Sequence, residues 1–148
     1  MLSHEMGIKE MLGNPKSVFS LLTPEEKEHL LKHITLANFK KNEFIYKEGD
    51  KPTGFSFLIE GKIKIFKEGV GGREQIIRMT KPMGYIGYRA LLAEELHIAS
   101  AVALEDSLAC HVDPDFFFNR MLKNSDVTAK ILRKLARELG FSNSRTVT

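Results

Sequence analysis

Residues 55–65 read FSFLIEGKIKI, in which two short apolar runs are separated by a glutamate and Gly61. In the second run Ile63 and Ile65 alternate with lysines, and this alternation predicts a strand with one buried face and one exposed face. A glycine between two strands permits a sharp turn, because it has no side chain to clash there. The segment therefore predicts two strands joined at a tight corner.

The same pattern of short apolar runs extends on both sides of this segment, from residue 34 to residue 112. Apolar residues alternate with polar ones there, and Gly, Pro, Asn and Asp interrupt the runs about every ten residues, as is typical of short strands. Residues 68–73 are rich in glycine and predict a hairpin connection. The predicted strands are 35–40, 43–46, 54–60, 62–67, 74–79, 99–103 and 107–111.

Two helical segments are predicted before the β-rich region. Residues 23–26 read TPEE, which supplies a threonine cap, a proline at the first helical position and a glutamate that completes a capping box. They predict a helix over 24–33. An apolar cluster at 18–22 predicts a short helix packed on the domain, whereas residues before about Gly7 are expected to fray.

Two helices are also predicted after the β-rich region. Asp113 and Pro114 suit the cap and the first position of one helix. A longer helix should begin near Ser125 or Asp126, because apolar residues then recur at spacings of three and four. Gly140 either ends this helix or only weakens it. The apolar stripe comprises Val127, Ile131, Leu132, Leu135 and Leu139.

The chain has 148 residues, of which 43% are hydrophobic and 28% charged, as expected of one compact domain. Its 22 Lys and Arg against 19 Asp and Glu leave a net charge of +3, which is too small to indicate nucleic-acid binding. The single cysteine, Cys110, excludes an internal disulfide and a four-cysteine cluster supplied by this chain alone. Because no apolar run could span a bilayer and no signal pattern is present, we expect a cytoplasmic protein without a membrane partner.

The order of these elements, a helix, several short strands and then two helices, coincides with three local motifs. They are FIYKEGD at 44–50, FSFLIEGKIKI at 55–65 and GYIG at 84–87. Over nearly its whole length the chain resembles the N-terminal domain of regulators of the cyclic-AMP receptor protein/FNR (Crp/Fnr) family. There the motifs mark the turn before the central strands, the end of the strand that opens the roll and the start of the phosphate-binding cassette. The resemblance implies a mainly β fold with flanking helices: a double-stranded β-helix (a jelly roll, or cupin-like β-roll) followed by a long C-terminal dimerisation helix.

Family members that bind cyclic nucleotides carry a Glu just after the Ile-Gly of the cassette, which holds the ribose hydroxyl. A later Arg-Ser/Thr-Ala run supplies the Arg that pairs with the cyclic phosphate. Here Tyr88 stands in the place of the Glu and Ala99 in the place of the Arg. A buried phosphate without a cationic partner loses charge-assisted hydrogen bonds worth several kcal/mol. The sequence therefore predicts a small-molecule effector other than cyclic AMP, and no resident cofactor.

The resemblance also implies where an effector would bind. Arg89 either replaces the missing guanidinium or lies exposed on a surface turn. Backbone amides at Gly87 and Ser100 and the hydroxyl of Ser100 suit a polar or acidic molecule. Ser142 and Asn143 stand where the family's terminal helix touches its ligand, unless they form an exposed tail. The predicted ligand-binding residues are Gly87, Tyr88, Arg89, Ser100, Ala101, Ser142 and Asn143.

A β-roll is also similar to cupin enzymes, whose metal is held by closely spaced histidines and a carboxylate. None of the five histidines forms a His-x-His pair, and His29 and His33, four apart, lack a nearby third ligand. The sequence contains no nucleophile elbow and no P-loop. We therefore expect neither an enzyme nor a metal site, and we interpret Cys110 as a buried core thiol rather than a redox sensor.

Residues 1–124 are expected to form the N-terminal helices, the β-roll and the following short helix, and residues 125–148 the dimerisation helix and the start of a hinge. The predicted homodimer seam comprises Ile131, Leu132, Leu135 and Leu139, with part of this stripe packing on its own roll.

In the full-length family this helix leads into a helix-turn-helix domain that binds DNA, and the present chain leaves no room for one. The chain is therefore interpreted as the effector-sensing part of such a regulator, either a piece of a longer protein or a stand-alone subunit. The alternatives are a cupin-like metal-dependent enzyme and a stand-alone dimerising module with an empty pocket.

Overall fold

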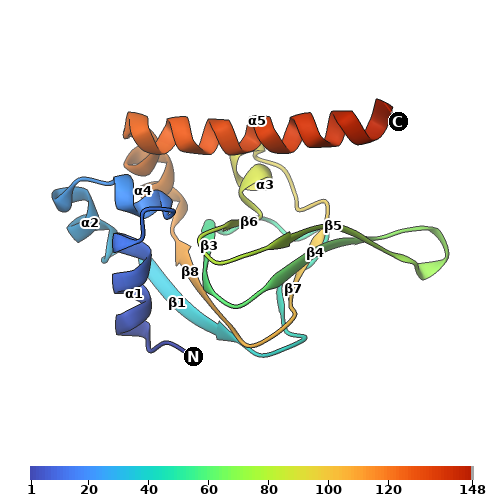
Figure 1. The fold of residues 1–148 in the computed structure, drawn as a ribbon, viewed down its shortest axis with the longest axis horizontal. Coiled ribbons are helices and arrows are strands. Elements are labelled where there is room, and N and C mark those ends of the chain that lie inside the picture. Colours follow the sequence, from blue (N-terminus) through green and yellow to red (C-terminus); the bar gives the residue numbers. More distant parts are fainter. Residues whose placement is uncertain (148) are drawn as a thin grey trace.

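The computed structural model describes the backbone of residues 1–147 and the side chains of residues 1–140. The chain begins with α1 (His4–Gly13), the short 3-10 helix η1 (Val18–Leu21) and α2 (Pro24–Leu30). The capping box of α2 is present, because Thr23 accepts the backbone N–H of Glu26 and the Glu26 carboxylate accepts that of Thr23. These helices lie at one end of the molecule (Figure 1).

The N-terminal helices differ from the prediction at two ends. Residues before Gly7, expected to fray, belong to α1 from His4 on, and Ser3 caps this helix by accepting the backbone N–H of Met6. The helix predicted over 24–33 ends at Leu30. There the backbone N–H of His33 donates to the Leu30 carbonyl, a three-residue turn that leads the chain into the first strand.

Eight strands form two antiparallel four-stranded sheets, with the orders β1-β8-β3-β6 and β2-β7-β4-β5. The two sheets form the β-roll, and the β4–β5 hairpin projects well beyond it (Figure 1). The mainly β fold with flanking helices predicted from the sequence is confirmed. The strands are β1 (Ile34–Phe39), β2 (Phe44–Tyr46), β3 (Phe55–Glu60), β4 (Ile63–Glu68), β5 (Glu74–Thr80), β6 (Tyr85–Ile86), β7 (Ser100–Ala103) and β8 (Ser107–Val112).

Strand β3 separates two apolar clusters. Its Phe55 and Phe57 are fully buried with the helices, and Phe19 of η1 packs edge-on against both rings. Its Leu58 points to the other side, into the smaller cluster inside the roll with Ile63. Burying each such side chain contributes roughly 1.5–3 kcal/mol. The apolar run at 55–59 thus anchors the helices on one face and closes the roll on the other.

Gly61 forms the corner predicted between β3 and β4. Its φ is +108°, in the region that favours glycine, and a Cβ there would collide with the side chain and backbone of Ser107. Ser107 is fully buried, and its hydroxyl accepts the backbone N–H of Lys62. The corner therefore requires a residue without a side chain.

The remaining helices are α3 (Tyr88–Ala93), α4 (Pro114–Asn119), the 3-10 turn η3 (Met121–Lys123) and α5 (Ser125–Val147). Helix α5 lies along one side of the molecule, above α3 and α4, and runs on toward the side from which the β4–β5 hairpin projects (Figure 1). It continues through Gly140, so this glycine weakens the helix without ending it. Asp113 caps α4 as predicted, with its carboxylate accepting the backbone N–H of Phe116 at 2.8 Å.

Candidate functional site

The segment GYIGYRA at 84–90 forms the short strand β6, a turn at Gly87 and the first residues of α3. Gly87 has a φ of +70°, and a Cβ there would lie 2.7 Å from the His97 ring and 2.9 Å from the Tyr46 ring. Only a glycine lets the backbone pass so close to these two rings. The turn directs the following side chain, Tyr88, toward helix α5.

Tyr88 connects the roll to α5 directly. Its side chain is only 4% exposed, and its hydroxyl donates a hydrogen bond to Oε2 of Glu138 at 2.7 Å. Burial and this bond to a carboxylate raise the pKa of the Tyr88 phenol far above its usual value. Tyr88 is therefore a neutral hydrogen-bond donor at any physiological pH.

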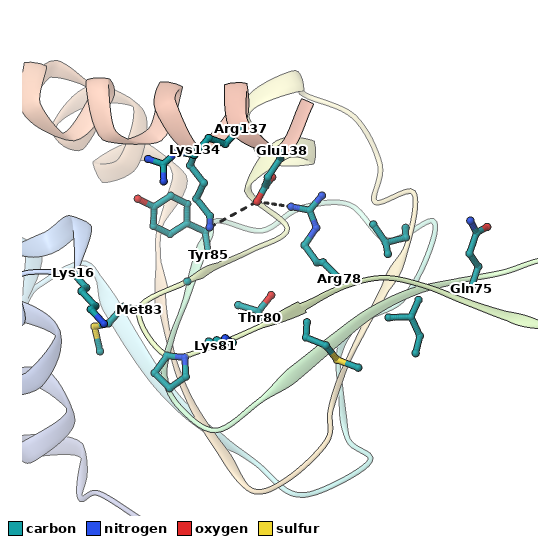
Figure 2. A pocket seen from close by; sticks show the side chains of 15 residues that line it. Lys16, Gln75, Arg78, Thr80, Lys81, Met83, Tyr85, Lys134, Arg137 and Glu138 are labelled. Atoms are coloured by element: carbon teal, nitrogen blue, oxygen red, sulfur yellow. Dashed lines mark ion pairs between the residues drawn. The ribbon is translucent and has the colours of Figure 1, made fainter. Parts of the chain in front are cut away.

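The Glu138 carboxylate also binds two cations. Arg78 of β5 forms an ion pair with its Oε1, and Lys134, one turn earlier on α5, places Nζ 3.7 Å from the same oxygen. Figure 2 shows the Arg78 and Lys134 side chains converging on Glu138. Only 24% of the Glu138 side chain is exposed, so the group is screened from water on most sides. One carboxylate thus ties β5, α3 and α5 together.

Tyr46 and His97 form another wall of the cavity that Tyr88 and Glu138 border. Their rings stack in parallel with centroids 3.6 Å apart. The turn that follows Tyr46 is fixed to His97 by two backbone bonds, from Gly49 N–H to the His97 carbonyl and from His97 N–H to the Asp50 carbonyl. Burial lowers the pKa of His97, although the nearby Asp50 charge opposes this effect. The lowered pKa favours the neutral form of His97.

The cavity between these groups has a volume of about 80 Å³. Its wall includes Tyr46, Tyr88, Arg78, His97 and Glu138. Sites for small organic ligands usually measure about 300–1,000 Å³. This hollow alone is therefore smaller than a typical ligand site.

A wider groove of about 690 Å³ lies next to the cavity, between β5 and α5. Arg78, Tyr85 and Glu138 line both hollows, so they form the boundary between them. The groove carries five Lys or Arg side chains against one Glu, which makes it strongly basic. These cations, shown in Figure 2, are Lys16, Arg78, Lys81, Lys134 and Arg137.

The predicted ligand residues separate into two groups. Gly87 and Tyr88 line the cavity, whereas Arg89, which also borders it, is 47% exposed and has its guanidinium 3.8 Å from the Glu95 carboxylate. Ser100 is buried, and its hydroxyl accepts the backbone N–H of Glu48 at 2.9 Å. Ala101 is fully buried inside the roll.

Ser142 and Asn143 lie in the last part of α5, and their side chains are outside the described residues.

The four residues of the predicted dimer seam on α5 also fall into two groups. Ile131 is 2% exposed and belongs to the chain's own core, and Leu135 packs partly against that core. Leu132 and Leu139 are 59% and 63% exposed and lie on the flank of the helix next to this pair. The first pair therefore holds α5 on the roll, and only the second pair presents apolar surface outward.

Arg78 and Glu138 were missed as site residues in the sequence. Arg78 follows two isoleucines in β5, and a β-bulge at the second of them, Ile77, changes which way the neighbouring side chains point. Glu138 gave a weak signal, as an acidic residue among the many Lys and Arg of α5. Their meeting depends on the docking of α5, which sequence spacing does not specify.

Two further observations concern the alternatives considered from the sequence. His33 lies beyond the end of α2, and its Nδ1 is 2.7 Å from the Asp113 carboxylate, so His29 and His33 do not share a helical face. Within the described residues no three His, Cys, Asp or Glu side chains are grouped as metal ligands. Among the helices of residues 1–147, none is both long enough and apolar enough to cross a bilayer.

A closed β-roll with a small internal cavity, connected to a long helix, defines a class of sensory domain. The chain belongs to the cyclic nucleotide-binding domain family, whose model matches residues 36–124. The family and the fold are those of regulatory domains, and not of enzymes.

Regulators are prominent among the similar proteins. The cyclic AMP receptor protein of Thermus thermophilus is 31% identical over 97 residues, which cover 66% of this chain but only 44% of that protein. The sensor domain of the transcriptional regulator DNR from Pseudomonas aeruginosa superposes with a TM-score of 0.78 at 20% identity, covering 97% of this chain and 95% of that one. The Thermus thermophilus catabolite activator protein gives a TM-score of 0.75 at 25% identity, over 87% of this chain and 61% of that one. The resemblance to Crp/Fnr regulators is therefore confirmed.

Proposed function

We propose that this chain is the effector-sensing part of a bacterial Crp/Fnr-type transcription regulator, acting in the cytoplasm as a homodimer. Its effector is a small molecule other than cyclic AMP, and α5 carries the signal to a DNA-binding domain outside these residues. The observation that carries this proposal is the hydrogen bond from Tyr88 to Glu138. It joins a residue of the effector cavity to the helix that would transmit the signal.

The cavity argues against cyclic AMP as the effector. Tyr88 and Ala99 replace the Glu and Arg that hold the ribose and phosphate in cyclic nucleotide-binding relatives, and the Tyr88 hydroxyl is already bonded to Glu138. Arg89 faces solvent and the Glu95 carboxylate. A cyclic phosphate at the usual place would therefore lack its cation, at a cost of several kcal/mol.

Transmission through α5 follows from the same contacts. A ligand shifts a conformational equilibrium only through its different affinity for the two states. A molecule that displaces Tyr88 or Glu138 from the wall of the cavity would break the hydrogen bond between them and so alter the contacts that hold α5. The N-terminal part of α5 is fixed in the core by Val127 and Ile131. Farther along, the helix is held by the contacts of Glu138 with Tyr88 and Arg78, so this part can respond when those contacts change.

The homodimer would form through the outward face of α5. The exposed Leu132 and Leu139 are seven residues apart. Ala129 and Ala136 each lie three residues before one of these leucines, which gives the alternating spacing of three and four residues typical of a coiled coil. This seam retains two of the four residues predicted from the sequence. The other two, Ile131 and Leu135, are assigned to the attachment of α5 to its own roll.

A thermal-shift screen of the purified chain tests the proposed function. A ligand that binds only the folded state raises its melting temperature, by an amount that grows with concentration. We expect a shift with an acidic or polar metabolite that is lost in Tyr88→Ala, and none with cyclic AMP or cyclic GMP. A large shift with a cyclic nucleotide would contradict the proposed effector class, and no shift with any compound would favour a dimerising module without an effector.

A further inference from the structure

Arg78 occupies the boundary between the small cavity and the basic groove. Strand β5 carries it, and its guanidinium is close enough to the Tyr46, Tyr88 and Glu138 side chains to affect the first two phenols by its charge. A guanidinium next to a neutral phenol donor is a combination that binds carboxylates and phosphates, because both groups donate hydrogen bonds to an anion. In the free chain the anion at this point is the chain's own Glu138.

We propose that Arg78 and Tyr88 form an anion subsite of the effector cavity, that the Glu138 carboxylate occupies it in the free protein, and that an effector carrying a carboxylate or phosphate displaces Glu138 and so acts on α5. This inference rests on the proposed sensory function, and adds to it the chemical class of the effector and the residue with which it competes.

The displaced Glu138 would retain a partner. Lys134 lies one helical turn earlier with Nζ 3.7 Å from the carboxylate, and this pair moves with α5. The carboxylate therefore does not become an uncompensated buried charge when it leaves Arg78, which would otherwise oppose displacement strongly. The incoming anion supplies Arg78 with a negative charge in place of the Glu138 carboxylate.

The groove provides a route of approach for an anion. The whole chain has a net charge of only +3, yet the groove alone gathers Lys16, Lys81, Lys134 and Arg137 beside Arg78. Such a concentration of one sign of charge raises the local concentration of anions and their rate of association. Figure 2 shows Arg78 and Lys81 on the segment around β5, Lys134 and Arg137 on α5, and Lys16 beside the N-terminal helix. An anion would reach Arg78 from this open side.

The test compares the affinity of four proteins for two simple anions, inorganic phosphate and succinate, at constant ionic strength. The proteins are the wild-type chain, Glu138→Gln, the double variant Arg78→Gln/Glu138→Gln, and Glu95→Gln as the matched control. Glu95 is a suitable control because it also pairs with an arginine, the exposed Arg89. Titration followed by NMR chemical shifts measures binding separately from any change in stability.

We expect Glu138→Gln to bind at least one of the anions about tenfold more tightly than the wild-type chain, because the competing carboxylate has been removed. The double variant should lose this gain, and Glu95→Gln should behave as the wild-type chain. A gain with phosphate alone would indicate a phosphorylated effector, and a gain with succinate alone a carboxylic acid. Glu138→Ala also removes the competing carboxylate and serves if Glu138→Gln does not fold, whereas Tyr88→Phe should bind the anions less tightly, because it removes a donor of the subsite.

Two results would overturn the inference: no gain when the Glu138 carboxylate is removed, or a gain that persists without Arg78. They would leave the proposed function intact if the metabolite screen still finds a ligand whose binding requires Tyr88. If no metabolite raised the melting temperature in that screen, but Glu138→Gln bound an anion more tightly, the results would support the subsite and contradict the sensory role.

Discussion

Tyr88 and Glu138 show how a single exchange of side chain changes the use of a shared fold. In cyclic nucleotide-binding relatives the position of Tyr88 supplies a carboxylate to the ligand, whereas here the phenol reaches across the cavity to a carboxylate on α5. The side chain that would bind a ribose hydroxyl is thus replaced by one that forms a hydrogen bond within the protein. The stability of that contact, and of the His97 stack beside it, can be measured one residue at a time.

Tyr88→Phe should lower the free energy of unfolding by about 1.5 kcal/mol, because a hydrogen bond to a charged acceptor in a largely buried site is lost. Urea denaturation followed by circular dichroism measures the change. Tyr85→Phe is the matched control, since Tyr85 packs beside Tyr88 and its hydroxyl makes no hydrogen bond within the described residues. Equal losses in the two variants would contradict the importance of the Tyr88 contact.

His97 should make the fold less stable in mild acid. Its pKa is lowered by burial, so below the ordinary value of 6.5 the unfolded chain binds a proton that the folded chain does not. The contribution of neutral His97 is present above that pH and is lost as the pH falls through the lowered folded-state pKa.

The variant His97→Phe keeps a ring against Tyr46 but cannot bind a proton. Urea denaturation at about pH 7 and about pH 5.5 should therefore show a smaller loss of stability in this variant than in the wild-type chain. His29→Gln, on the surface helix α2, is the control. The same pH dependence in all three proteins would contradict this role of His97.

Among the elements, those with a local signal were predicted well and those made by tertiary contacts were not. The capping box at 23–26, the cap at Asp113 and the alternation of β4 each gave an element close to its observed position. Strand β6 has two residues and helix α3 six, too few for a hydrophobic period to appear in the sequence. These two elements carry Tyr85 and Tyr88, so the least predictable part of the chain contains much of the site.

The corner between β3 and β4 gives a prediction at this level. Gly61→Ala should lower the free energy of unfolding by at least about 2 kcal/mol, because the new Cβ would be both strained and in collision with Ser107. Gly13→Ala, near the end of α1 where nothing lies within 4 Å of a Cβ, should be neutral or slightly stabilising. Urea denaturation compares the two, and a mild effect of Gly61→Ala would mean that the corner can relax.

Over the whole molecule, α5 has two faces with different tasks. The inner face holds the helix on the roll through Val127 and Ile131, and the outer face presents Leu132 and Leu139. The sequence predicted the stripe but could not divide it, because both faces follow the same spacing of three and four residues. Only the position of the roll determines which leucines are covered.

The double variant Leu132→Lys/Leu139→Lys should convert a dimer into a folded monomer, because it places charges in the proposed seam without touching the core. Light scattering after size-exclusion chromatography measures the mass. Leu31→Lys, an exposed leucine at the end of α2, is the matched control. A wild-type chain that is monomeric at all concentrations, or a variant that remains dimeric, would contradict the seam on the outer face of α5.

Coupling between cavity and helix is tested by hydrogen exchange of the backbone amides, with and without the compound that gives the largest thermal shift. The account predicts simultaneous changes in the cavity segment 84–100 and in residues 131–140 of α5, both absent in Tyr88→Ala. Changes confined to the cavity, with α5 unaffected, would contradict the proposal that this domain reports its effector through the helix.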